Sequence, residues 1–228
     1  TGLIAPIQEL AKLAHEHNAM IAIDGAHGPG MIPLDLKEWK CDFYGGNCHK
    51  WLCAPKGTGF LHAAPEVQDR LRHVFVGWGY SREGRTRGDD GGLLINGRPA
   101  MWGLETCGTR DLACFAAVAA AVDHQDAIGK DRVALRGRRL AAYLRDRLSG
   151  FDWAQLLTPT VPEMSGSISS YHLKGFEGLD LHKSYRITAP AGKRDGDLTW
   201  LRVSTHIYNG YDQIDRLVDV LDTCHSEG

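Results

Sequence analysis

Residues 19–24, AMIAID, form a short apolar run that ends on an acid, and this run constrains the fold more than any other stretch. Such a run is typical of a strand that is buried on both faces of a parallel sheet, with Asp24 at its carboxyl end. An amphipathic helix is expected just before it, with Pro6 in its first turn and Asn18 at its C-cap. The pattern predicts an α/β fold, in which ligands bind at the carboxyl ends of the strands.

Two more strands are predicted, over residues 42–47 (DFYGGN) and 57–63 (GTGFLHA). The segment GGNCHKWLCAPKG, residues 45–57, places Lys50 between a histidine and a tryptophan. A buried lysine requires a chemical reason, because removing its ammonium from water is costly. Since Asp24 and Lys50 each follow a strand of one sheet, we expect both side chains to project into one crevice.

The pattern of the remaining residues predicts a long loop, two helices and then several strands with a closing helix. Residues 77–98 are rich in glycine and charge without any period, which predicts a long loop. Helices are expected from Asp111 to Gly129 and along the apolar stripe that starts at Val133. Later elements are strands over residues 166–173, 185–188 and 198–207, followed by a closing amphipathic helix. We therefore predict a large domain over residues 1–129 and a small α+β domain over residues 130–228.

Composition excludes several classes of function. The 228 residues carry a formal net charge of -2, so no global field favours nucleic acid or a membrane as partner. No apolar run reaches the ~18 residues that a membrane span requires. The six cysteines are scattered and form a poor disulfide framework, which favours a reducing cytoplasm.

The residues expected in the crevice suit pyridoxal phosphate. A lysine forms the Schiff base with this cofactor, and an acid keeps the pyridine nitrogen protonated so that the ring accepts electrons. Gly45, Gly46 and the short Asn47 allow the chain to approach a phosphate closely, and His49 can donate a hydrogen bond to it.

Three motifs in order carry a resemblance to a known family: DGAHGPG at 24–30, NCHKW at 47–51 and LRVSTHIYN at 201–209. The chain resembles the class V aminotransferase group of pyridoxal phosphate enzymes and, within it, isopenicillin N epimerase-like proteins. The resemblance implies part of the large domain of a fold type I enzyme, with a mostly parallel sheet, plus a small C-terminal α+β domain. Relatives form homodimers and carry more strands and a ring-stacking residue before this point. We therefore expect the C-terminal part of a longer chain, which binds the cofactor weakly by itself.

The resemblance also assigns roles to individual residues around the cofactor. It implies that Asp24 pairs with the pyridine nitrogen and that His27 lies near the phenolic oxygen. Asn47 and His49 contact the phosphate, and Lys50 forms the Schiff base. Taken singly, Asp24 is equally well a turn residue and His27 a partly buried structural histidine.

Two further roles concern the partner subunit and the substrate. Thr109, in ETCGTR, matches a position that reaches the phosphate bound by the neighbouring subunit, although it could also be a cap beside Asp111. Arg202 matches the arginine that holds the α-carboxylate of the amino-acid substrate, a role that suits a planar bidentate guanidinium. Solubility alone could also explain an arginine on this strand.

The sequence also bears on other classes of function. Cys41, Cys48, His49 and Cys53 lack the paired C-x2-C spacing of tetrahedral zinc sites, so no metal is predicted. No cysteine lies in residues 186–202, which disfavours sulfur transfer through a persulfide. Epimerisation or racemisation at an amino-acid α-carbon is the first choice. A carbon–sulfur lyase, an aminotransferase and a non-catalytic chain that retains the fold remain open.

Overall fold

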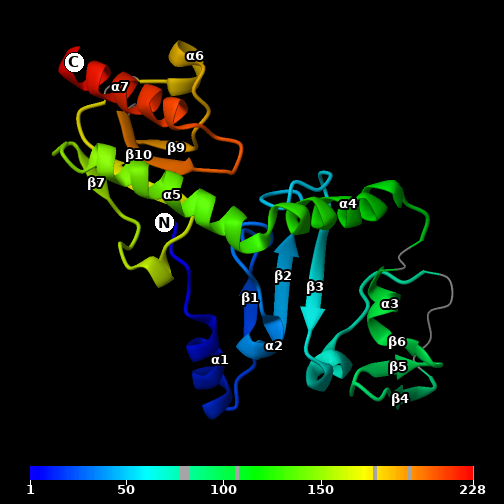
Figure 1. The fold of residues 1–228 in the computed structure, drawn as a ribbon. Coiled ribbons are helices and arrows are strands. Elements are labelled where there is room, and N and C mark those ends of the chain that lie inside the picture. Colours follow the sequence, from blue (N-terminus) through cyan, green and yellow to red (C-terminus); the bar gives the residue numbers. More distant parts are fainter. Residues whose placement is uncertain (78–82, 106–107, 177–178, 195–196, 228) are drawn as a thin grey trace. The chain divides into compact units, whose positions relative to one another are not determined.

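The computed structural model describes residues 1–77, 83–105, 108–176, 179–194 and 197–227, and Figure 1 labels its elements. The chain divides into two compact units. The N-terminal unit consists of Pro6–Pro29 and Leu34–His124, and the C-terminal unit of Thr1–Ala5, Gly30–Pro33 and Gln125–Gly228. The predicted domain division at residues 129 and 130 stays a prediction.

A three-stranded sheet forms the centre of the N-terminal unit (Figure 1). Its strands are β1 (Ala22–Asp24), β2 (Phe43–Asn47) and β3 (Gly59–Ala63), in the order β1-β2-β3. β1 and β2 are parallel, with Asp24 opposite Gly45, whereas β2 and β3 are antiparallel. All three predicted strands are therefore present with shorter bounds. Asp24 is the last residue of β1, and Lys50 follows β2, its parallel neighbour.

Helices and a 3-10 turn flank this sheet in sequence. They are α1 (Ile7–Glu16), α2 (Leu36–Trp39) and η1 (Pro65–Arg70). The predicted helix between Pro6 and Asn18 is α1, and Asn18 adopts the left-handed conformation that ends it, with a φ of 54°. α2 begins after Asp35, whose carboxylate caps the backbone N–H of Glu38 at 2.9 Å.

The prediction of an unstructured loop over residues 77–98 was wrong for the part that the structure describes. Residues 78–82 lie outside the described residues, but the remainder contributes to a small antiparallel sheet of β4 (Arg85–Arg87), β5 (Leu93–Ile95) and β6 (Arg98–Pro99). Asn96 and Gly97 join β5 to β6 with φ angles of 52° and 76°. This Asn-Gly pair is a strong hairpin signal, which the glycine-rich composition concealed.

Two more helices follow, of which the second ends in the residues of the C-terminal unit. α3 spans Ala100–Glu105 and α4 spans Ala113–Ile128. The Asp111 carboxylate accepts a hydrogen bond from the backbone N–H of Ala113 at 2.8 Å, so it supports the start of α4 as the sequence predicts.

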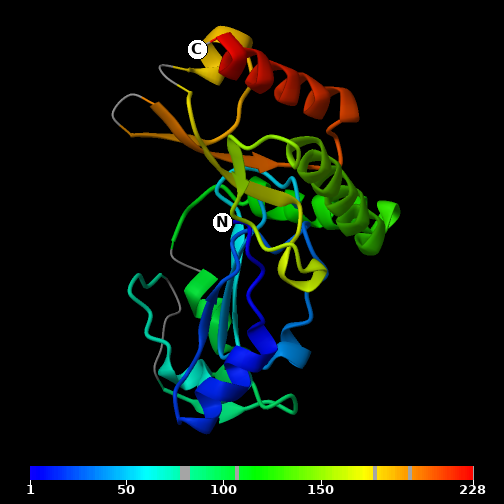
Figure 2. The same ribbon diagram turned by 90° about the vertical axis from the view of Figure 1, so that its left-hand side faces the viewer.

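The C-terminal unit is an antiparallel sheet with helices packed against it (Figure 2). The strands β7 (Ala154–Leu156), β8 (Ile168–Leu173), β9 (Ala191–Arg194) and β10 (Asp197–Ser204) have the order β7-β8-β10-β9. The other elements are α5 (Lys130–Leu148), η2 (Pro162–Met164), α6 (Leu181–Tyr185) and α7 (Tyr211–Glu227). Leucines of α5 and α7 form one buried core with Tyr171 and Leu201 of the sheet. Each such side chain contributes about 1.5–3 kcal/mol by leaving water.

The predicted strand over residues 185–188 was also wrong. Tyr185 ends α6, which starts where the Asp180 carboxylate accepts a hydrogen bond from the N–H of Lys183 at 3.0 Å. Arg186 follows in the left-handed conformation with a φ of 57°. A capped turn of helix therefore overrides the β-propensity of YRIT, and β9 pairs with β10 instead.

None of the helices in the described part of the chain is both long and apolar enough to cross a membrane.

Candidate active site

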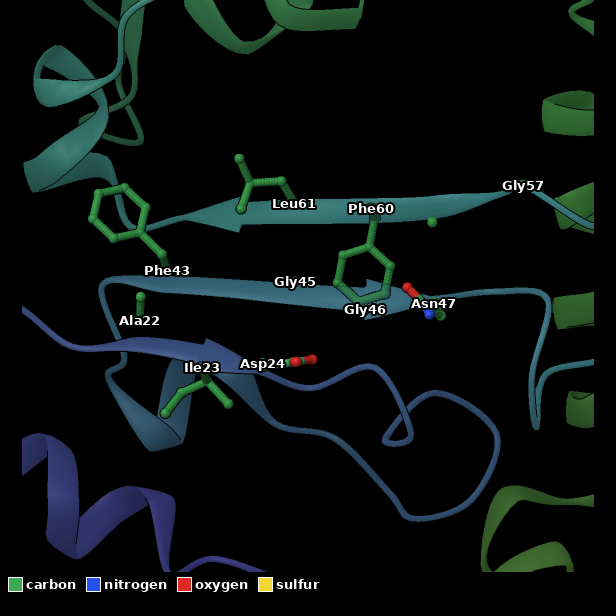
Figure 3. A pocket seen from close by; sticks show the side chains of 11 residues that line it. Ala22, Ile23, Asp24, Phe43, Gly45, Gly46, Asn47, Gly57, Phe60 and Leu61 are labelled. Carbon is green, nitrogen blue, oxygen red and sulfur yellow. The ribbon is translucent and has the colours of Figure 1, made fainter. Parts of the chain in front are cut away.

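An open hollow of about 750 Å³ lies along β1, β2 and β3. Figure 3 shows Asp24 and Asn47 at the ends of two neighbouring strands that line it. A Cβ added at Gly45 would meet no atom within 4 Å, so the glycine leaves this part of the hollow open. The hollow therefore offers a carboxylate, an amide and free space at the carboxyl ends of two parallel strands.

The chain after β1 folds tightly over the ring of Tyr44. The Tyr44 hydroxyl donates to the carbonyl of Gly25 at 3.1 Å, and the Gly28 N–H donates to the same carbonyl at 2.8 Å. A Cβ at either glycine would overlap Tyr44 atoms. Burial raises the pKa of Tyr44 to about 12. Asp24 forms a local turn as well, because its carboxylate accepts from the N–H of Ala26 at 3.1 Å.

Lys50 sits in a loop whose two ends are joined by hydrogen bonds. The N–H of Cys48 donates to the carbonyl of Thr58 at 3.0 Å, and the N–H of Ala54 donates to the carbonyl of Cys48 at 3.0 Å. Within the loop, the N–H of Cys53 donates to the carbonyl of Lys50 at 3.2 Å, and Cys53 has a φ of 62°. These bonds fix the backbone that carries the lysine.

His27 lies between the side chains of Lys50 and Trp51. Its Nε2 is 3.4 Å from Lys50 Nζ, and its Nδ1 accepts a hydrogen bond from Trp51 Nε1 at 3.0 Å. The two aromatic rings meet edge to face, with centroids 6.5 Å apart. Trp51 is only 6% exposed, so its indole is held in place by packing. The loop after β1 and the loop after β2 are thereby brought together at the lysine.

His49 makes a different contact. Its Nδ1 lies 3.0 Å from the carbonyl of Thr58, an acceptor, so Nδ1 carries a hydrogen. In the neutral ring Nε2 is then an acceptor. Donation from Nε2 to a phosphate oxygen, which the sequence predicts, therefore requires the imidazolium form.

Thr109 and Arg202 belong to other parts of the chain than these two loops. Thr109 is exposed between α3 and α4. Arg202 belongs to the C-terminal unit, where its backbone N–H donates to the carbonyl of Pro190 at 2.8 Å. Its Nε is buried and makes no hydrogen bond to the described residues. A buried N–H that makes no hydrogen bond is costly, so this nitrogen requires an acceptor.

Of the predicted residues, the structure brings His27 to Lys50, and Asp24 to the same hollow as Asn47. Among the described residues, Lys50, His27 and His49 do not line that hollow. Sequence reasoning missed Trp51, Tyr44 and Thr58 as partners of these residues, and their contacts join positions distant in sequence. No group of three or more His, Cys, Asp or Glu in the described ranges is arranged to hold a metal ion.

Comparison with known proteins identifies the family. The fold is that of fold type I pyridoxal phosphate enzymes. One match is a mutant of the C–S lyase C-DES with glycine covalently linked to the PLP cofactor. The match covers 97% of this chain and 57% of the C-DES chain, with a TM-score of 0.78 and 20% identity. The sequence profile described as Aminotransferase class-V matches residues 1–217. The chain belongs to this family.

Curated relatives of two activities match the chain along nearly its whole length. The isopenicillin N epimerase of Amycolatopsis lactamdurans is 39% identical over 229 residues, which cover 97% of this chain and 56% of the relative. The cysteine desulfurase of Haloferax volcanii is 30% identical and covers 97% of this chain and 52% of the relative. The chain thus spans just over half the length of these relatives.

Proposed function

We propose that the whole protein is a pyridoxal phosphate-dependent epimerase or racemase that acts at the α-carbon of an amino acid. Lys50 is the residue that attaches the cofactor covalently. The observation that carries this proposal is the Lys50 amine, which is fixed 3.4 Å from His27 on the loop that follows β2 in a class V aminotransferase chain. The 39% identity to an isopenicillin N epimerase supports the choice of reaction.

The residues present fit this cofactor. The exposed Asp24 carboxylate ends β1 and provides an anion for a protonated pyridine nitrogen. Gly45 leaves room beside it, and Asn47 supplies amide groups within hydrogen-bonding reach of the same hollow. The bound cofactor supplies an electron sink that makes the α-proton of an amino acid acidic.

The roles of the chain's own residues follow from that acidity. Asp24 keeps a proton on the ring nitrogen by its negative charge. The Lys50 amine takes the α-proton from the face of the carbon that it reaches, which is general acid–base catalysis by a positioned side chain. Delivery of a proton to the opposite face, by a second acid or by water, inverts the configuration, which defines an epimerase or racemase.

His49, Thr109 and Arg202 are proposed to bind charged groups. The imidazolium form of His49 donates Nε2–H to a phosphate oxygen, because Nδ1–H is already bound to Thr58. Thr109 serves the phosphate bound by a second copy of the chain, so the working enzyme is a homodimer. Arg202 binds the substrate carboxylate, for which its buried Nε supplies a donor without a hydrogen bond in the described part. Cys41 and Cys48 are buried thiols outside disulfides, which supports a reducing cytoplasm as the compartment.

A carbon–sulfur lyase is the second candidate, because a cysteine desulfurase is 30% identical over 97% of this chain. It shares the first steps, from cofactor attachment to removal of the α-proton. The absence of cysteine from residues 186–202 removes a nucleophile for persulfide formation there. This absence argues against sulfur transfer through an enzyme persulfide, while a lyase that needs no such persulfide stays the alternative to the epimerase.

The test uses the full-length protein in two stages. Borohydride reduction with the cofactor, followed by peptide mass mapping, is expected to place the pyridoxyl label on Lys50 and not on Lys56, the neighbouring lysine of the same loop. A label on Lys56 would overturn the assignment. Amino acids are then incubated in deuterated water with parallel assays for α-deuterium, keto acid and sulfide. α-Deuterium with inversion supports the epimerase, sulfide release selects the lyase, and keto acid without sulfide selects an aminotransferase.

A further inference from the structure

The indole of Trp51 restricts which nitrogen of His27 carries the proton. An indole N–H can only donate, so Nδ1 of His27, 3.0 Å from Trp51 Nε1, must be an acceptor. A neutral imidazole has one donor nitrogen and one acceptor nitrogen. The proton of His27 is therefore on Nε2. The doubly protonated ring is disfavoured, since it would place two donors against each other.

The remaining nitrogen of His27 is the one that faces the lysine. Nε2 lies 3.4 Å from Lys50 Nζ. With its proton on Nε2, His27 can donate only to the lone pair that Nζ has as an uncharged amine, which is also the form that attacks a carbonyl. The Nε2–H is thus a donor at the atom where the proposed function attaches the cofactor. A carbonyl or phenolic oxygen that arrives beside Nζ meets a donor and not a lone pair.

We propose that Trp51 is a positioning residue that holds His27 as a fixed hydrogen-bond donor beside Lys50. It acts through His27 and does not itself touch the reacting atoms. The inference rests on the proposed function for its consequence, whereas the tautomer follows from the hydrogen-bonding contacts of His27 itself.

Burial of Trp51 supports a fixed arrangement. The side chain is 6% exposed and follows Lys50 directly in the loop closed by the Cys48–Thr58 and Ala54–Cys48 backbone bonds. An indole that served only to fill space would not need its N–H within hydrogen-bonding distance of a ring nitrogen. A shape-matched replacement without that N–H therefore separates packing from positioning.

The variant is the full-length protein with β-(3-benzothienyl)alanine at position 51, which replaces the indole N–H by sulfur in nearly the same shape. Trp51→Phe is the second variant, and Trp102→Phe is the control, because Trp102 is 37% exposed and stacks on Arg98. Long-range ¹H–¹⁵N spectra of the cofactor-free protein report the tautomer of each histidine, and His27→Gln identifies the His27 signals by their loss.

The wild-type protein and Trp102→Phe are expected to show His27 with an unprotonated Nδ1 and a protonated Nε2. The benzothienyl variant is expected to show exchange between both tautomers. Timed borohydride trapping should show attachment of pyridoxal phosphate to Lys50 slowed about fivefold, equal to ~1 kcal/mol for one hydrogen bond.

A protonated Nδ1 in the wild-type protein overturns the proposal, and so does an unchanged tautomer in the benzothienyl variant. An altered tautomer with an unchanged rate overturns the positioning role. If wild-type Lys50 takes no label at all, the proposed function fails. The spectra of the cofactor-free protein then still decide whether the tautomer was assigned correctly.

Discussion

Replacement of Gly25 by alanine tests whether the loop after β1 is shaped by Tyr44. A Cβ at this position would overlap Cζ of the Tyr44 ring, well inside the 3.4 Å at which ordinary contact begins. The ring cannot retreat easily, because Tyr44 is 1% exposed and stacks on Phe60 with centroids 6.0 Å apart. Gly25 does not have a positive φ, so the expected cost is steric and not conformational.

The magnitude follows from two contributions. Overpacking a filled interior costs about 1–3 kcal/mol. Displacing the Tyr44 hydroxyl from the Gly25 carbonyl, now 3.1 Å away, costs about 1 kcal/mol more. Gly25→Ala is therefore expected to lower the stability of the N-terminal unit by about 2–4 kcal/mol.

Hydrogen exchange of the β1 and β2 amides in the full-length protein measures this free energy of opening. Gly45→Ala is the matched control, because its Cβ meets no atom within 4 Å and its stability should stay within about 1 kcal/mol of the wild type. In a Tyr44→Leu background the cost of Gly25→Ala should largely disappear, since the ring has gone. Equal exchange in the Gly25 and Gly45 variants would refute the reasoning.

The structure also sets expectations for Arg202, Tyr44 and Leu140. Arg202→Lys should weaken amino-acid binding by about 1.5–3 kcal/mol in substrate titrations, because an ammonium cannot form the two parallel hydrogen bonds of a guanidinium. The cofactor spectrum should stay intact, and loss of the cofactor with intact substrate affinity would contradict this role. Between pH 10 and about 12, Tyr44 has released its proton in the unfolded chain but retains it in the folded one, so the free energy of unfolding should fall as pH rises, by up to about 3 kcal/mol. Urea unfolding of Tyr44→Phe over the same pH range should show a shallower fall. Leu140→Ala, at a fully buried position, should lower the stability of the C-terminal unit by about 2–5 kcal/mol in thermal denaturation. Leu135 lies on the same helix at 47% exposure, and Leu135→Ala should change stability by no more than about 0.5 kcal/mol. Equal losses in the two variants would be inconsistent with this core.

The parts of the fold that could be predicted are those in which a segment's own side chains determine its burial. The apolar stripes of α5 and α7 are buried, because periodicity alone identifies the buried face. AMIAID contains β1 as predicted, but the expected burial on both faces was wrong, since Ala22 and Asp24 are exposed and Ile23 is half-buried. Residues 185–188 failed for the opposite reason. Their β-propensity was outweighed by the cap at Asp180 and the left-handed Arg186, and neither depends on the segment itself.

The site shows the same limit at the level of atoms. The order of motifs indicated which residue types lie at the strand ends, and in the structure Asp24 ends β1 while Lys50 follows the parallel strand β2. The contacts that give His27 its orientation join it to Lys50 and Trp51, which are 23 and 24 residues away. Sequence spacing carries no information about which ring nitrogen each of them meets.

The glycines of GGN illustrate why residue type alone cannot separate a structural from a ligand-binding role. Both Gly45 and Gly46 were expected to let the chain approach a phosphate. In the structure a Cβ at Gly46 would press on the Phe60 ring and on Pro29, so internal packing already requires this glycine. A Cβ at Gly45 would meet nothing within 4 Å, so the packing of this unit gives no reason for it. The open space beside Gly45, next to Asp24 and Asn47, is therefore the part of the motif that the described packing does not fill, and under the proposed function it is where the cofactor lies.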